Sequence, residues 1–236
     1  MESYDASTMG NWHHDIRIND DVRTSHLSDP HHHAFVCKES LAAQFNAAYN
    51  HKLHNKNVLD VACNAGGHLF ALNQHRINYG YGFDARQMWI NQAHWVQRNI
   101  DDDASNLTFE TGSFELLQQF PNKHFHITMF NGIFYHLPDP IAALQQVAAK
   151  TSEIICINTS FVHQIDAMPA LVLKHECTDH ALSGLHHLSW LPNGEQVIIN
   201  IMQHLQFKHC KTLFKDHHHM RMCIIASTDA ALIRNF

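Results

Sequence analysis

Short apolar runs alternate along this chain with stretches whose apolar residues recur at helical spacing. Runs typical of buried strands lie at residues 58–62, 79–83, 107–110, 126–130 and 153–158. Helical patterns lie at residues 37–49, 66–75, 88–98, 140–150 and 193–205. Residues 207–214 and 220–226 form two more strand-like runs, joined by a polar turn. This order predicts an α/β fold with a seven-stranded, mostly parallel sheet, one antiparallel edge strand and helices on both faces.

The pattern also predicts how the chain is divided. Residues 1–36 are expected to form an amino-terminal lead-in and cover segment, and residues 37–236 one domain with an insertion at about 160–190. Within the cover segment, apolar anchors are spaced among polar residues from Trp12 to Thr24. Two interpretations stay open: a strand-like or irregular segment that packs over a ligand site, and a solvent-facing hairpin.

The first strand runs directly into a turn of small residues, Val58-Leu-Asp-Val-Ala-Cys-Asn-Ala-Gly-Gly67, and a helical run follows. Asn64 and Gly66 tolerate unusual backbone dihedrals, so the turn can be tight. In an open α/β sheet, a strand, tight turn and helix form a ligand site at the strand's carboxyl end. Free N–H groups at the helix start favour a polar ligand there.

An acidic residue, Asp84, ends the second strand, 24 residues after Asp60. A carboxylate at this place accepts hydrogen bonds from the hydroxyls of a ribose, which indicates a nucleotide-like ligand. The alternative is that Asp84 only caps the helix that follows. Both roles are compatible.

Together these motifs resemble the class I S-adenosylmethionine-dependent methyltransferases. Asp60-Val-Ala-Cys-Asn-Ala-Gly66 resembles their motif I, Asp/Glu-x-Gly-x-Gly-x-Gly, with Ala62 and Asn64 in place of two glycines. Residues 125–140 are similar to the fourth strand and loop of many such enzymes. The Gly-x-x-Tyr-His core at 132–136 and the segment 12–24 resemble the small relatives of the tRNA wobble-uridine carboxymethyltransferase. The resemblance covers roughly residues 12–228 and implies a Rossmann-like sheet.

The resemblance also implies which residues bind the cofactor, S-adenosyl-L-methionine, and its product S-adenosyl-L-homocysteine. The loop after the third strand would meet the adenine, with core packing as the alternative for Phe114. The implied cofactor residues are Asp60, Ala62, Cys63, Asn64, Gly66, Asp84, Ala85, Met88, Gly112, Ser113, Phe114, Asn131 and Gly132.

The candidate catalytic groups, Tyr135 and His136, lie in the loop after the fourth strand. His136 suits a general base because an imidazole titrates near neutrality, and a structural histidine is the alternative. Tyr135 would orient the substrate or, in a carboxymethyltransferase, contact the extra carboxylate of the donor. Aromatic and imidazole groups on covering segments suit a small acceptor, and they are Trp12, His14 and Trp190. For these three, packing is an equal alternative.

Charge and composition indicate which kinds of binding partner the sequence favours. The formal net charge is −6, and partial protonation of the 24 histidines brings the true charge near zero, so a nucleic-acid partner is not favoured. No run is long and apolar enough for a membrane helix, and a cytoplasmic protein with a small-molecule substrate is expected. The triplets His31–His33 and His217–His219 have no acid or thiol at ligand spacing, so no metal is expected. Composition leaves the oligomeric state open.

The leading hypothesis is therefore a methyltransferase that moves a methyl group from S-adenosylmethionine to a small molecule by in-line displacement. One alternative is a tRNA-modifying (carboxy)methyltransferase. Another is a non-catalytic S-adenosylmethionine-binding regulatory module, since two glycines of the turn are replaced.

Overall fold

A computed structural model describes residues 9–28, 36–163, 168–176 and 182–236. The chain forms two compact units, Met1–Leu116 and Leu117–Phe236. The strand order is β3-β2-β1-β4-β5-β9-β8, and a separate pair is formed by β6 and β7. This confirms the seven-stranded, mostly parallel sheet predicted from the sequence, with β9 as the antiparallel strand of the edge pair β9-β8.

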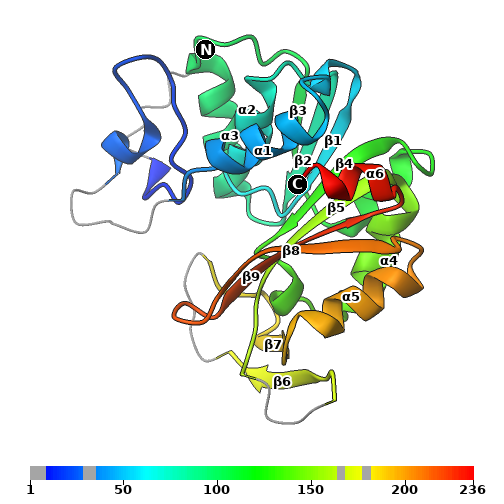
Figure 1. Cartoon of the computed structure of the whole chain (residues 1–236). Coiled ribbons are helices and arrows are strands. Elements are labelled where there is room, and N and C mark those ends of the chain that lie inside the picture. Colours follow the sequence, from blue (N-terminus) through cyan, green and yellow to red (C-terminus); the bar gives the residue numbers. More distant parts are fainter. Residues whose placement is uncertain (1–8, 29–35, 164–167, 177–181) are drawn as a thin grey trace. The chain divides into compact units, whose positions relative to one another are not determined.

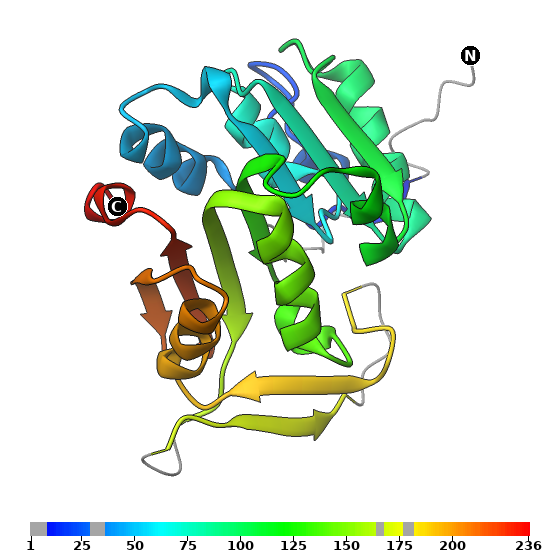
Figure 2. The ribbon, with the colours of Figure 1, turned by 90° about the vertical axis from the view of Figure 1, so that its right-hand side faces the viewer.

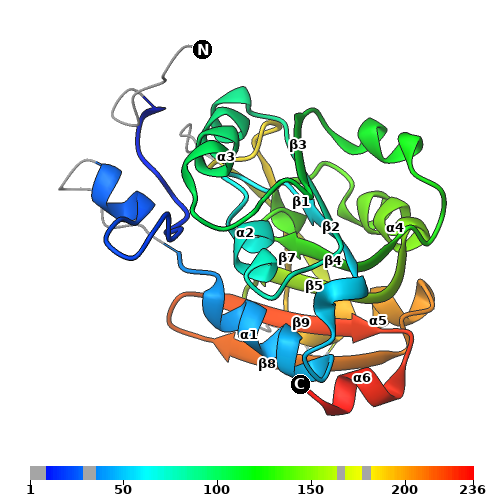
Figure 3. The same ribbon diagram turned by 90° about the horizontal axis from the view of Figure 1, so that it is seen from above.

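The first unit holds three parallel strands: β1 (Asn57–Val61), β2 (Tyr79–Asp84) and β3 (Leu107–Thr111). They pair in register, with Asp60 opposite Gly82 and Asp84 opposite Thr111. The α-helices described in this unit are α1 (Glu39–Ala48), α2 (Gly67–Asn73) and α3 (Gln87–Asn99). Figures 1 and 3 show α2 and α3 beside the three strands. The carboxyl ends of β1 and β2 thus lie next to each other.

Burial explains why these strands form. Four of the five residues of β1 and five of the six residues of β2 are buried, as continuous apolar runs in a covered parallel sheet predict. Helix α2 ends at Asn73 rather than at residue 75 as expected, and Arg76 beyond it has a positive φ of 58°. A left-handed backbone terminates helices.

The amino-terminal segment of the first unit is irregular, with single bridges between His14 and Val36 and between Arg17 and Arg23. Its anchors Trp12, Ile16 and Ile18 are buried, so the segment is not a solvent-facing hairpin. Residues 24–27 form a short 3₁₀ turn, η2 (Thr24–Leu27), that the sequence pattern did not indicate.

The second unit contains β4 (Phe125–Asn131), α4 (Pro140–Lys150) and β5 (Thr151–Ser160), with β4 and β5 parallel. Helix α4 has the bounds expected from its proline, and the Asp139 carboxylate accepts the Ala142 N–H at its start. Strand β9 (Arg221–Ser227) pairs antiparallel with both β5 and β8 (His209–Asp216). Helices α5 (Glu195–His204) and α6 (Ala230–Arg234) pack on β8 and β9 (Figure 1).

The insertion contains an antiparallel two-stranded ribbon, β6 (Leu171–His175) and β7 (Leu188–Pro192), drawn in yellow in Figure 2. The helix expected over residues 193–205 begins at Glu195 and ends at His204. Gly194 is the cap residue, and the Asn193 side chain bonds the backbone of Ala170 and Met168 at 2.9 and 2.8 Å.

Among the described residues, no helix has both the length and the apolar character needed to cross a membrane. The thiols of Cys63, Cys156 and Cys223 are buried, and those of Cys156 and Cys223 lie 3.7 Å apart.

Candidate functional site

The turn after β1 is wound by three residues with left-handed backbone. The φ angles are 54° at Ala62, 52° at Asn64 and 77° at Gly66. Glycine adopts such angles without penalty, asparagine tolerates them, and alanine does so at a cost. The positions at which motif I usually has glycine are therefore the positions where this backbone needs it. Gly66 also lies under the Phe109 ring, where an added Cβ would come within 2.5 Å.

The Asp84 carboxylate ties this turn to the end of β2. Its Oδ2 accepts the N–H of Asn64 at 3.0 Å, and its Oδ1 accepts the N–H of Arg86 at 2.9 Å. Burial raises the pKa of Asp84, while the hydrogen bonds from Arg86 and Asn64 lower it. Asp84 does not cap α3, because Arg86 occupies the cap position and the helix begins at Gln87. A carboxylate has about four acceptor positions, so two remain for hydroxyl donors.

A second carboxyl group, that of Asp60, is buried beneath the turn. Its Oδ2 has no hydrogen-bond partner among the described residues. Burial raises its pKa to about 8, with a further rise from Asp84 and a reduction from Lys38. Buried polar atoms are normally paired, so this oxygen is an acceptor that lacks a donor. An ammonium group would supply one.

His14 lies over the start of α2. Its Nδ1 accepts the N–H of Gly67 at 3.1 Å, and its own carbonyl accepts the Thr24 hydroxyl at 2.6 Å. Burial, with Lys38, His68 and His13 nearby, holds the pKa of His14 well below its usual value. The ring is therefore neutral, with its proton on Nε2. This contact joins the amino-terminal segment to the residue after the turn.

Trp12, the other substrate candidate on this segment, is fully buried and its ring meets that of Trp95 edge-on at 5.6 Å. Its contacts are those of a core residue. Its indole nitrogen has no hydrogen-bond partner among the described residues.

The loop after β3 holds the residues expected to meet an adenine. Gly112 donates its N–H to the carbonyl of Asp84 at 3.0 Å, which brings this loop to the end of β2. The Ser113 N–H points to the Glu115 carboxylate at 2.8 Å. The Phe114 ring is half-buried and lies edge-on to Phe83 at 5.8 Å.

The remaining cofactor candidates of the first unit differ in exposure. Ala85 and Met88 are exposed, with 38% of Met88 accessible, so both can contact a ligand. Cys63 is buried, and burial raises the pKa of its thiol well above the usual value, so the side chain is an uncharged thiol without access to solvent.

In the second unit, Asn131 is the last residue of β4 and Gly132 follows it. The Asn131 side-chain oxygen accepts the Asn158 N–H at 2.8 Å, and the Gly132 N–H bonds the Asn158 carbonyl at 2.8 Å. Both residues thus fix the strand end to β5. Gly132 has a φ of 77° and open space at its Cβ position.

Tyr135 and His136 belong to a short 3₁₀ turn, η5 (Phe134–His136). The Tyr135 hydroxyl lies 2.9 Å from Nη1 of Arg221, and the guanidinium also stacks over its ring at 5.1 Å. Within the described residues Arg221 has no carboxylate partner in a salt bridge. This pair is a cationic group beside a hydroxyl, which together suit an anion.

His136 is paired with an acid from the insertion. Its Nδ1 lies 3.0 Å from Oε2 of Glu176, and both side chains are nearly buried. The Gly184 N–H donates to the same Glu176 oxygen at 3.0 Å. Trp190 lies nearby on β7 and donates its indole N–H to the Pro138 carbonyl at 3.1 Å. Two contacts therefore join the insertion to the loop after β4.

Sequence reasoning missed Glu176, Gly184 and Arg221. Glu176 and Gly184 lie in a stretch without clear periodicity, and Arg221 is 86 residues from Tyr135. The sequence offered only one glycine and three acidic residues in this stretch, and none of them identifies a partner.

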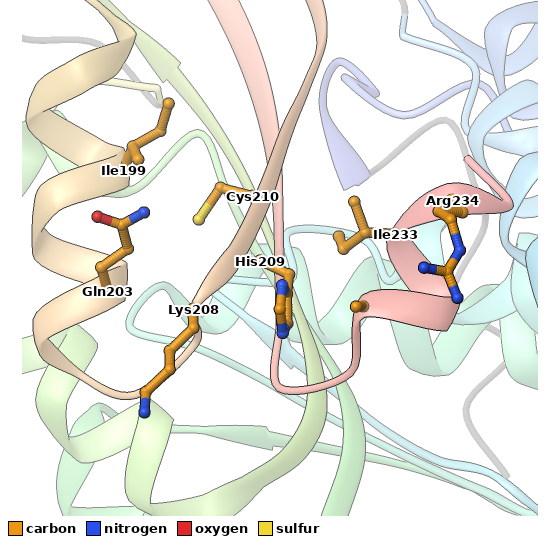
Figure 4. Close-up of a pocket in the computed structure, with 8 residues that line it drawn as sticks. Ile199, Gln203, Lys208, His209, Cys210, Ile233 and Arg234 are labelled. Carbon is orange, nitrogen blue, oxygen red and sulfur yellow. The ribbon is translucent and has the colours of Figure 1, made fainter.

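The second unit also has a pocket of about 390 Å³ that contains none of the predicted site residues. Figure 4 shows Ile199 and Gln203 on α5, Ile233 and Arg234 on α6, and Cys210 between the two helices.

No group of three His, Cys, Asp or Glu residues within the described ranges could hold a metal ion. His31–His33 lie outside those ranges.

Comparison with known proteins gives the family. A model described as "Methyltransferase domain" matches residues 52–218. The tRNA U34 carboxymethyltransferase of Alteromonas mediterranea is 34% identical over 98 residues, covering 40% of this chain and 29% of that protein. The same enzyme of Aliarcobacter butzleri is 29% identical over 110 residues, covering 44% and 35%. The matches thus span about a third of these relatives.

Solved structures agree in fold. The N-terminal domain of EvdMO1, crystallised with SAH and D-fucose, superimposes with a TM-score of 0.75 at 16% identity, covering 95% of this chain and 94% of that one. Magnesium protoporphyrin IX methyltransferase from Synechocystis PCC 6803, with bound SAM, gives a TM-score of 0.57 at 15% identity, covering 81% and 77%.

Proposed function

Because the chain belongs to the methyltransferase domain family, we propose that it transfers a methyl group from S-adenosylmethionine to a small-molecule acceptor. When bound, S-adenosylmethionine supplies a methyl group on a positive sulfur, and the C–S bond breaks with its electron pair going to sulfur. The tasks left to the protein are to hold the donor, orient the acceptor and exclude water.

The proposed binding of S-adenosylmethionine rests mainly on the Asp60 oxygen that has no hydrogen-bond partner among the described residues. S-adenosylmethionine has an α-ammonium group with three N–H donors, which matches a buried acceptor without a donor. Asp84 has acceptor positions left for the ribose hydroxyls, since backbone N–H groups use only one position on each oxygen. Exposed Met88 offers an apolar contact for the adenine face. Together they would supply an acceptor for the ammonium group, acceptors for the ribose hydroxyls and an apolar surface for the adenine.

A small acceptor is favoured over tRNA by charge. The chain lacks a net positive charge, whereas binding to a nucleic-acid backbone needs several phosphate contacts from Lys or Arg. The relatives named for tRNA match only residues equal to about a third of their length, so their acceptor is not carried over.

The test is a turnover assay that follows S-adenosylhomocysteine formation. Purified protein is incubated with S-adenosylmethionine and either a fractionated small-metabolite extract or bulk tRNA. Turnover with a metabolite fraction supports the proposal. Turnover with tRNA alone, weakened by added salt, would replace it with a tRNA-modifying function.

One observation favours a second function. A carboxymethyltransferase needs a donor that carries a carboxylate, and Arg221 beside the Tyr135 hydroxyl suits such a group. Parallel binding measurements with S-adenosylmethionine and its carboxylated analogue separate the two donors. A preference for the carboxylated form that disappears in Arg221→Met would favour carboxymethyl transfer.

A further inference from the structure

We propose that Glu176 is a positioning residue that holds His136 in place as the general base. His136 would take up the proton that the substrate loses on methylation, and the substrate is therefore an O–H or N–H compound. This inference rests on the proposed function, and it adds a residue and a substrate class that the family match does not supply.

The proposal rests on the positions of three groups, which are the Glu176 carboxylate, the His136 ring and the Gly184 N–H. Glu176 Oε2 lies 3.0 Å from Nδ1 of His136, with 13% and 11% of the two side chains exposed. The same oxygen accepts the Gly184 N–H at 3.0 Å, so the carboxylate is held from a second direction. A hydrogen bond between two nearly buried side chains that is supported by a backbone donor is more rigid than a pair on the surface.

The pairing decides which ring nitrogen can take up a proton. A carboxylate only accepts hydrogen bonds, so the proton of a neutral His136 lies on Nδ1 and the lone pair lies on Nε2. The acceptor's proton would move to Nε2 as its oxygen or nitrogen forms the new bond to the methyl carbon. Glu176 then faces an imidazolium, whose positive charge it stabilises. A nucleophile that has no proton to lose would gain nothing from this arrangement.

The insertion itself supplies this carboxylate. Glu176 follows β6 directly, and Gly184 precedes β7. The Trp190 indole on β7 bonds the Pro138 carbonyl at 3.1 Å, so the ribbon is fixed to the loop that carries His136 at a second point. The orientation of His136 is therefore set by a segment outside the seven-stranded sheet.

Gly184 offers a test that changes no polar group. A Cβ added there would lie 2.8 Å from Glu176 Oε2 and 3.0 Å from His136 Nδ1. The flexible carboxylate end can move aside at little cost to the fold, but this movement breaks its bond to His136. Gly194 is the matched control, because its Cβ position meets nothing within 4 Å and its φ of 164° is extended.

The experiment compares Glu176→Gln and Gly184→Ala with the controls Glu195→Gln and Gly194→Ala. Glu195 is a partly exposed residue whose partner is Lys215. Three quantities are measured: the ¹⁵N shifts of the His136 ring without ligand, S-adenosylhomocysteine affinity, and kcat and KM with the acceptor found by the metabolite screen. The His136 signals are assigned as those missing in His136→Gln.

We expect the wild type and both controls to show a neutral His136 with its proton on Nδ1. Glu176→Gln and Gly184→Ala should lose this signature, and kcat should fall about 10-fold or more with affinity for S-adenosylhomocysteine unchanged. A wild-type ring with its proton on Nε2, or an unchanged kcat in Glu176→Gln, would overturn the inference. A protein that does not bind S-adenosylhomocysteine would instead overturn the proposed function.

Discussion

The Asp84 carboxylate accepts the backbone N–H of Asn64 at 3.0 Å, so the end of β2 holds the turn that follows β1. The other Asp84 oxygen accepts the Arg86 N–H and fixes the start of the next loop. One side chain therefore sets the geometry of two loops in the first unit. The proposed contact to a ribose would use the same two oxygens.

Ala62 should be a site where glycine stabilises the protein. Its φ of 54° is left-handed and strains alanine, so Ala62→Gly is expected to raise the free energy of unfolding by about 0.5–1 kcal/mol. The control is Ala93→Gly in the interior of α3, which should lower it by about 1 kcal/mol. Urea denaturation measures both. A loss of stability in Ala62→Gly would contradict the assigned backbone conformation.

Asp60 should make stability depend on pH. Its folded pKa of about 8 lies above the value of an unfolded aspartate, so the folded state binds its proton more tightly. This contribution is complete below pH ~4 and is lost as pH rises through 8. The wild type should therefore lose stability relative to Asp60→Asn across this range, measured by urea denaturation at pH 5, 7 and 9. A constant difference would contradict an unpaired, buried carboxyl group.

His14 should give a pH dependence of stability that is opposite to that of Asp60. Its folded pKa lies well below the unfolded value near 6.5, so the unfolded state takes up the proton first. Stability from this residue is present above pH ~6.5 and is lost as pH falls below it. Thermal unfolding of the wild type and His14→Gln at pH 5.5 and 7.5 tests this. The wild type should show the larger drop on acidification, and equal drops in the two proteins would show that His14 is not held neutral.

Most of the parallel sheet could be predicted because its strands are buried on both faces and read as apolar runs. The turn at residues 62–66 was recognisable by its small residues, and Asp84 by its spacing from Asp60. The sequence could not reveal that the backbone at Ala62 and Asn64 is left-handed, because the sign of φ is a property of the folded chain.

The contacts of Tyr135 and His136, the residues proposed to act on the substrate, were less predictable from the sequence. Glu176 reaches His136 across 40 residues, and Arg221 reaches Tyr135 across 86. Such contacts depend on tertiary structure and leave no periodic signal. The strands β6 and β7 were also missed, since nearly all their residues are half-exposed or exposed and their burial does not alternate. Trp12 was proposed for the substrate, but its burial against Trp95 could be seen only in the fold.

The proposed function requires that the first unit bind S-adenosylmethionine at the turn with the help of Asp84. Calorimetric titration with S-adenosylhomocysteine tests this directly, using the wild type, Asp84→Ala and the control Asp229→Ala. Asp229 also accepts a backbone N–H, at the start of α6, far along the chain from the turn. We expect the wild type and Asp229→Ala to bind one equivalent with equal affinity, and Asp84→Ala to bind about 10- to 100-fold more weakly. Equal affinity in Asp84→Ala, or no binding by the wild type, would contradict the central claim.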